Sequence, residues 1–226
     1  MKKGIKKTLE NITEDAVIWL LVAGCSIAAP FVKNKNIFSN PVTVERKMEV
    51  PELWGMVSPG DLFLYEYEES RPLTEDEIDS YLDDLYKEIR LPKYLDKTYI
   101  KALTYAESKW NPIIVSERGA MGIGQLMPNT LIDYKKYISP DDNIFDPNKN
   151  LEITLIHVWE QNNYLRRNFP NWKELSDQGK RDINCLVYNY GITRLEKNNW
   201  NLDEIPEETK DHIANVRNYY LTKKFS

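Results

Sequence analysis

The sequence predicts a mainly α-helical domain, preceded by an apolar N-terminal segment. Two observations support the helical domain: apolar residues recur with a helical period from residue 74 onward, and a capping motif or a proline marks the start of several periodic stretches. With 226 residues, of which 42% are hydrophobic, the chain is long enough for one globular core plus an extension. The domain is therefore expected over residues 74–226.

The first helix should begin at Thr74, because Thr74 and Glu77 form a capping box. Its buried face is marked by Ile78, Leu82, Leu85 and Ile89, and Pro92 ends it. A second helix is predicted from about Lys97 to Lys109, with Glu107 near its end.

Four further helices are expected along the rest of the chain. A proline within a first turn is favourable, so Pro147 should open a long helix. In order, the predicted segments are a short helix over 129–137, a loop over 141–146, the long helix over 147–168, a helix over 178–189 that ends near Gly191, and a last helix over 207–221.

The N-terminal segment has no charge between Ala16 and Val32, and lysines precede it. This length approaches the roughly 17–25 residues that span a bilayer, and the lysines would hold the N-terminal end in the cytoplasm. Residues 1–32 are expected to be a membrane anchor or a cleavable signal. Acylation at Cys25, as in a lipoprotein, and a buried helix are alternatives. Residues 33–73 contain scattered Asn, Pro and Gly and are expected to be a partly ordered linker.

The composition excludes some classes of function. Lys and Arg number 30 against 35 Asp and Glu, and the net charge of −5 argues against nucleic-acid binding. Two cysteines and two histidines lack the spacing of metal ligands, so neither a metal nor a cofactor is expected. Cys185 lies on an apolar helical pattern and should be buried.

The stretch from Glu107 to Pro128 is the strongest candidate for a functional site. Glu107 leaves an apolar helix, and a segment with three glycines (Gly119, Gly122 and Gly124) and one amide, Gln125, follows. Burial of a carboxyl raises its pKa, which suits a general acid. Glycines let the backbone approach a bulky ligand. The pattern therefore suggests an acid at the wall of a cleft.

This stretch resembles the signature of the soluble lytic transglycosylase family, whose domain is similar to goose-type lysozyme. The resemblance rests on Glu107-Ser108, Asn111-Pro112, Val115-Ser116, Gly119-Ala120, Gly122 and Gln125-Leu126-Met127-Pro128. Tyr188-Asn189-Tyr190-Gly191 and Glu208-Thr209 are similar to two later blocks of the family. The similarity covers about residues 92–220 and implies a lysozyme-like helical fold.

The resemblance also implies an activity and residue roles. Glu107 would protonate the bond between N-acetylmuramic acid and N-acetylglucosamine in peptidoglycan, then take the C6 hydroxyl proton as a 1,6-anhydro ring closes. Gln125 and Asn189 would bind sugar and acetamido groups, and Tyr188 would orient Glu107 or the acetamide. Further contacts would come from Ser108, Met127 and Glu208. We expect a monomer in the cell envelope, in the periplasm or on the extracellular face, acting on glycan strands.

Two positions depart from the family pattern, and two other functions remain open. Tyr190 stands where alanine is usual, and His212 stands where a tyrosine is usual; the first could narrow a subsite or fill the core, and the second could change affinity or pH sensitivity. A muramidase on the same fold would need a second carboxylate, for which the candidates are Glu117, Asp133 and Asp146. A wall-binding module without catalysis is the third alternative.

Overall fold

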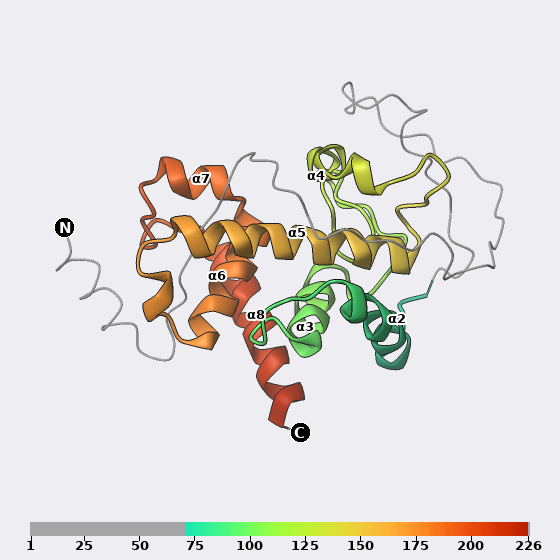
Figure 1. The fold of residues 1–226 in the computed structure, drawn as a ribbon, viewed down its shortest axis with the longest axis horizontal. Coiled ribbons are helices and arrows are strands. Elements are labelled where there is room, and N and C mark those ends of the chain that lie inside the picture. The colour runs from blue at the N-terminus through green and yellow to red at the C-terminus, as the bar shows by residue number, and fades with distance from the viewer. Residues whose placement is uncertain (1–70, 226) are drawn as a thin grey trace. The chain divides into compact units, whose positions relative to one another are not determined.

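A computed structural model describes residues 71–225 of the chain (Figure 1). The predictions for residues 1–32 and 33–70 lie outside the described residues. Within residues 71–225 the chain is mainly helical, as predicted, and its only β-structure consists of isolated bridges. None of the helices in this part combines the length and the apolarity that a bilayer crossing requires.

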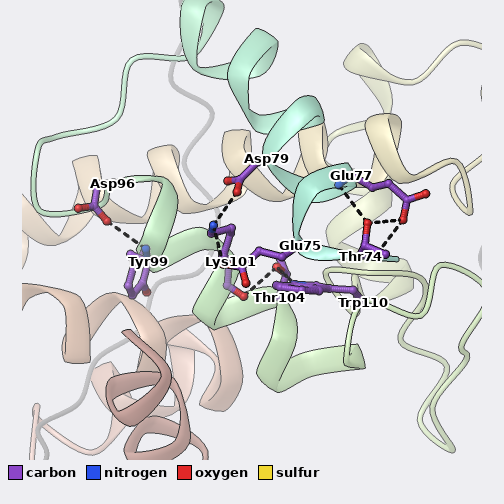
Figure 2. A network of polar contacts seen from close by, with 9 residues as sticks. All are labelled: Thr74, Glu75, Glu77, Asp79, Asp96, Tyr99, Lys101, Thr104 and Trp110. Carbon is purple, nitrogen blue, oxygen red and sulfur yellow. Dashed lines mark hydrogen bonds and ion pairs between the residues drawn. The ribbon is translucent and has the colours of Figure 1, made fainter. Parts of the chain in front are cut away.

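Helix α2 (Glu75–Glu88) begins with the predicted capping box. The Thr74 hydroxyl accepts from the Glu77 N–H at 3.3 Å, and the Glu77 carboxylate accepts from the Thr74 N–H at 2.7 Å (Figure 2). Ile78, Leu82 and Ile89 are buried, as the predicted face requires, whereas Leu85 is half-buried. The helix ends at Glu88, before Pro92, because Ile89 already has an extended backbone.

Helix α3 (Lys97–Ser108) packs on α2 through a buried lysine. The ammonium of Lys101 lies 2.9 Å from a carboxylate oxygen of Glu75 and 2.9 Å from one of Asp79 (Figure 2). The helix starts at the Asp96 cap, which accepts from the Tyr99 N–H at 3.0 Å. It ends where Lys109 turns into the left-handed region, with φ 53°. This end is one residue earlier than predicted.

The predicted helix over 129–137 is divided into α4 (Pro128–Asp133) and the 3-10 turn η2 (Lys135–Tyr137). The division falls at Tyr134, whose buried side chain shares a hydrogen bond of 3.0 Å with Nδ1 of His157. Helix α5 (Pro147–Asn168) has the predicted bounds. The Asp146 carboxylate caps it by accepting from the N–H groups of Asn148 at 2.8 Å and Lys149 at 3.2 Å.

The contacts divide the described chain into two compact units, residues 71–160 and residues 161–225. In the second unit, the 3-10 turn η3 (Trp172–Glu174) and α6 (Asp177–Tyr190) are followed by α7 (Ile192–Lys197) and α8 (Glu207–Phe225). The sequence did not predict η3 or α7. Cys185 in α6 is buried, as predicted.

Helices α6 and α8 pack against each other in antiparallel orientation. Arg217 pairs with Asp182 at 2.6 Å, and the Arg181 guanidinium lies 4.2 Å from the ring centre of Tyr220. Along α6, Arg181 comes before Asp182, whereas along α8 its partner Tyr220 comes after Arg217, the partner of Asp182. The two helices therefore run in opposite directions. The last turn of α6 and the first turn of α8 therefore lie at the same end of the pair.

Candidate active site

Glu107 lies in the last turn of α3 and is neither fully enclosed nor fully exposed. Burial raises the pKa of its carboxyl from 4.5 to about 8. Part of the residue remains accessible, so the raised pKa reflects protein packed around the carboxyl group itself. A carboxyl with this pKa holds its proton at pH 7, which is the protonation state that a general acid requires.

Ser108 joins the end of α3 to the glycine-containing loop. The residue is buried, and its hydroxyl donates to the Ile123 carbonyl at 2.8 Å, with the Thr104 carbonyl at 3.3 Å. This hydrogen bond connects the residue next to Glu107 with the middle of the loop. Its hydroxyl is engaged with backbone, which favours a supporting role; the predicted contact with substrate stays a prediction.

The loop between α3 and α4 folds back on itself through two antiparallel bridges. Met121 pairs with Val115 on one side and with Leu126 on the other. Gly119 and Gly122 have φ values of 82° and 69°, which residues with a Cβ rarely adopt. Gln125, with φ 49°, takes the same left-handed region without being glycine. The two bridges and the three residues with positive φ therefore fix the backbone conformation of the loop around Gln125.

Gln125 uses its amide N–H groups to hold the loop. Its Nε2 donates to the Gly122 carbonyl at 2.9 Å and to the Ile114 carbonyl at 3.2 Å. Its Oε1 makes no hydrogen bond to any residue in the described range, so the amide offers a ligand an acceptor but no donor. Met127 follows two residues later and is exposed by 41%, an apolar surface that a ligand can contact.

Asn150 holds the loop that carries Gln125, although it was not predicted as a site residue from the sequence. It lies in the first turns of α5, is fully buried, and makes three hydrogen bonds to backbone. Its Oδ1 accepts from the Gly124 N–H at 2.7 Å, and its Nδ2 donates to the carbonyls of Met121 at 3.1 Å and Ile144 at 2.9 Å. In the sequence, the only indication of this role was an amide near the start of a long helix. An amide at such a position is usually exposed to solvent, so it did not suggest a buried contact.

The room at Gly122 has a different use from the expected one. A Cβ at this position would lie 2.3 Å from Nδ2 of Asn150 and 3.2 Å from the Ile144 carbonyl oxygen. The missing side chain thus makes room for a buried amide of α5. The sequence suggested that this glycine lets the backbone approach a bulky ligand, but the space at Gly122 is filled by the Asn150 side chain.

The remaining predicted site residues belong to the second unit. Tyr188 is half-buried and Asn189 is exposed in the last turn of α6, and Glu208 is exposed in the first turn of α8. The antiparallel packing brings these three residues to one end of the α6–α8 pair. Glu107, Ser108, Gln125 and Met127 lie in the first unit, where the Ser108 hydroxyl contacts the loop at the Ile123 carbonyl. The roles of Tyr188, Asn189 and Glu208 toward Glu107 stay predictions.

The two departures from the family pattern are both half-buried. Tyr190 ends α6, and the Arg194 guanidinium lies 5.5 Å from the centre of its ring. His212 lies in the second turn of α8, at the same end of the pair as Tyr188. Tyr190 is thus neither a core residue nor a freely exposed ring.

The three candidates for a second carboxylate differ in their surroundings. Glu117 is exposed in the turn between Ser116 and Ala120, and Asp133 is exposed at the end of α4. Asp146 caps α5, a structural role. Burial raises the pKa of Asp133. Across residues 71–225, no three His, Cys, Asp or Glu side chains are grouped so as to hold a metal ion.

Comparison with known proteins identifies the family. Residues 84–209 match the family described as Transglycosylase SLT domain. Soluble lytic murein transglycosylases of Escherichia coli K12 and O157:H7 are each 28% identical over 154 residues, which cover 61% of this chain and 22% of the relative. The chain thus spans about a fifth of the length of these relatives.

Two solved structures are also similar. One is the 70-kDa soluble lytic transglycosylase in complex with bulgecin A (24% identity, TM-score 0.46, 67% of this chain and 25% of that one). The other is the 70-kDa soluble lytic transglycosylase of Escherichia coli (26% identity, TM-score 0.42, 64% of this chain and 24% of that one). The family match alone covers more than half of the present sequence, and the protein therefore belongs to the Transglycosylase SLT domain family.

Proposed function

We propose that the protein is a peptidoglycan lytic transglycosylase with Glu107 as its single catalytic acid and base. It cleaves the β-1,4 bond between N-acetylmuramic acid and N-acetylglucosamine and forms 1,6-anhydromuramic acid. The observation that carries the proposal is the carboxyl of Glu107, whose pKa burial raises to about 8. Membership of the family supports the same reaction, and we propose a lysozyme-like fold for residues 74–226.

The first step uses the neutral carboxyl. At pH 7 Glu107 holds its proton and donates it to the glycosidic oxygen, so the bond from that oxygen to C1 of the muramic acid breaks. The N-acetyl group of the substrate stabilises the cation that develops at C1. An ordinary glutamate would be ionised at this pH and could not donate.

The second step uses the carboxylate that the first step leaves. Because the ionised form is disfavoured by burial, this carboxylate is a stronger base than a solvated glutamate. It removes the proton of the C6 hydroxyl while O6 bonds to C1, which closes the 1,6-anhydro ring and restores the neutral acid. No water is consumed, so a second carboxylate to activate water is not needed.

The other residues bind the sugar. Gln125 accepts a hydrogen bond from the substrate through Oε1, since its N–H groups already donate to the Gly122 and Ile114 carbonyls. Met127 contacts apolar atoms of the sugar with its exposed side chain. Ser108 holds the loop, and family membership supports Tyr188, Asn189 and Glu208 as further substrate-binding residues.

The location follows from the substrate and from the first 32 residues. We propose that the protein acts in the cell envelope, as a monomer, with residues 1–32 as an anchor or an export signal and residues 33–73 as the linker. The uncharged run from Ala16 to Val32, with lysines before it, supports this assignment.

Incubation of the full chain with peptidoglycan sacculi, followed by mass spectrometry of the released fragments, tests the reaction. We expect fragments that end in 1,6-anhydromuramic acid. Glu107→Gln should remove this activity, by at least about 100-fold, because the amide cannot transfer the proton. Glu88→Gln is the matched control, since Glu88 is exposed at the end of α2, and it should leave the products unchanged.

Other products would overturn the proposal in distinct ways. Fragments that are heavier by one water and end in reducing muramic acid would identify a muramidase, and Glu117→Gln and Asp133→Asn would then locate the second carboxylate. Binding to sacculi without release of fragments, unaffected by Glu107→Gln, would identify a wall-binding module.

A further inference from the structure

The loop that carries Gln125 is held from two sides by polar side chains. On one side, the Ser108 hydroxyl donates to the Ile123 carbonyl at 2.8 Å. On the other side, the buried amide of Asn150 spans the segment, accepting from the Gly124 N–H at 2.7 Å and donating to the Met121 carbonyl at 3.1 Å. Three contacts within residues 121–124 therefore connect the loop to both α3 and α5.

The fit between Asn150 and the loop is close. The amide is fully buried, and Nδ2 also donates to the Ile144 carbonyl at 2.9 Å, so it connects the loop to the segment before α5. Gly122 has no Cβ at the point where one would meet Nδ2 at 2.3 Å. A buried amide with its donors and acceptor paired has one arrangement, because any shift leaves a polar group unsatisfied.

We propose that Asn150 is a positioning residue for the reaction: it holds residues 121–125 against the end of α3, and so sets where Gln125 and the loop stand relative to Glu107. Asn150 does not contact the substrate; it acts through the loop backbone. The inference rests on the proposed function only for its effect on turnover, since the positioning itself is a property of the fold.

Two consequences distinguish positioning from general stabilisation. When the loop moves, Gln125 meets the sugar in the wrong place, and turnover falls even in molecules that are fully folded. Water also gains access to the end of α3. Because burial is what raises the pKa of Glu107, that pKa should fall toward 4.5.

Two variants of the full chain approach the same contact from opposite sides. Asn150→Asp keeps the acceptor for Gly124 and removes the amide donors, while Gly122→Ala places a methyl group against Nδ2. For each, we expect kcat to fall by about 10- to 100-fold with KM changed by less than about 3-fold. The alkaline limb of the pH profile should move to lower pH.

Thr154→Val is the control, because Thr154 is a buried polar residue of the same helix whose hydroxyl has no hydrogen-bond partner within residues 71–225.

Two measurements do not depend on activity. Titration of the Glu107 carboxyl by NMR should give a lower pKa in both variants than in the wild type and in Thr154→Val. Hydrogen exchange of the Gly124 N–H should be at least about 10-fold faster in Gly122→Ala, since the displaced amide no longer accepts from it. These readouts remain valid if the protein proves not to be a transglycosylase.

The proposal is overturned if the folded variants keep the kcat and the Glu107 pKa of the wild type and lose only thermal stability. Asn150 would then be a structural residue of the core. A loss of turnover equal to that in Thr154→Val would also overturn it, because it would show a general effect of changes in α5.

Discussion

The carboxyl of Glu107 is surrounded by protein, and this burial disfavours the charged form, which water would stabilise. Its pKa is raised from 4.5 to about 8, so between these values the folded state holds a proton that the unfolded state has lost. The stability associated with this group is fully present below about pH 4.5 and is lost as pH rises through 8. The buried carboxyl of Glu107 should therefore cost stability in alkaline solution.

Glu107→Gln should remove this pH dependence. Because glutamine has no charge to bury, the free energy of unfolding should be close to that of the wild type at pH 5 and should exceed it at pH 9, on the order of 2 kcal/mol after allowance for partial exposure. Urea denaturation at pH 5, 7 and 9 measures the difference. The control Glu88→Gln should show no such trend, and an equal gain at all three pH values would contradict the expectation.

The contacts of Asn150 could not be predicted from the sequence. Its partner Gly124 lies 26 residues earlier, and nothing in the neighbourhood of Asn150 along the chain indicates that contact. Glu107 was easier to find, because the end of an apolar helical pattern and the following glycines are local signals. The sequence predicted that Gln125 binds the sugar, but it did not indicate that both amide N–H groups donate to backbone carbonyls, those of Ile114 and Gly122.

At the scale of elements, helix starts followed local chemistry closely. The capping residue Thr74 directly precedes the first residue of α2, Glu75, and Pro147 is the first residue of α5. The helix over 129–137 was predicted whole but is interrupted at Tyr134, where a contact with His157 of α5 competes with helical continuity. Helix α7 was missed because six residues are too few to display a helical period.

Thr74→Ala should test the cap of α2. The change removes the acceptor for the Glu77 N–H, so we expect a loss of about 1 kcal/mol in the free energy of unfolding, or about 2–4 °C in Tm. Thermal unfolding at pH 7 measures it. Ser80→Ala, at an exposed position within the same helix, should be neutral or slightly stabilising. Equal effects of the two substitutions would show that the capping box contributes nothing.

The cap also has a pH signature of opposite sign to that of Glu107. Hydrogen bonds from Arg71 and Thr74 lower the pKa of Glu77 from 4.5 to about 2. A lowered pKa gives stability that is present above the unfolded value of 4.5 and is lost as pH falls through 2. Exposure of the group to solvent keeps this contribution small.

At the scale of the whole molecule, the proposed role of residues 1–32 as an anchor or an export signal can be tested by where the protein is found. We expect the full chain to sediment with membranes, and a variant without residues 1–32 to remain in the soluble fraction, because the uncharged run is the feature long enough to enter a bilayer. Fractionation and immunoblotting measure this. Cys25→Ser distinguishes the lipoprotein alternative, since it should abolish membrane binding only if an acyl chain provides it. A soluble full chain would refute the anchor.

The sequence by itself determined most of the helical segments and the family, and it singled out Glu107 as the candidate acid, because caps, periodicity and motif order are properties of residues near one another along the chain. The tertiary structure decided the chemistry of those residues. The buried amide of Asn150 contacts Gly124 and Met121, which lie 26 and 29 residues earlier in the chain, and the burial that raises the pKa of Glu107 exists only in the folded protein. Burial and hydrogen-bond partners arise only when those segments pack together, and they turn a glutamate at a helix end into an acid that is neutral at pH 7.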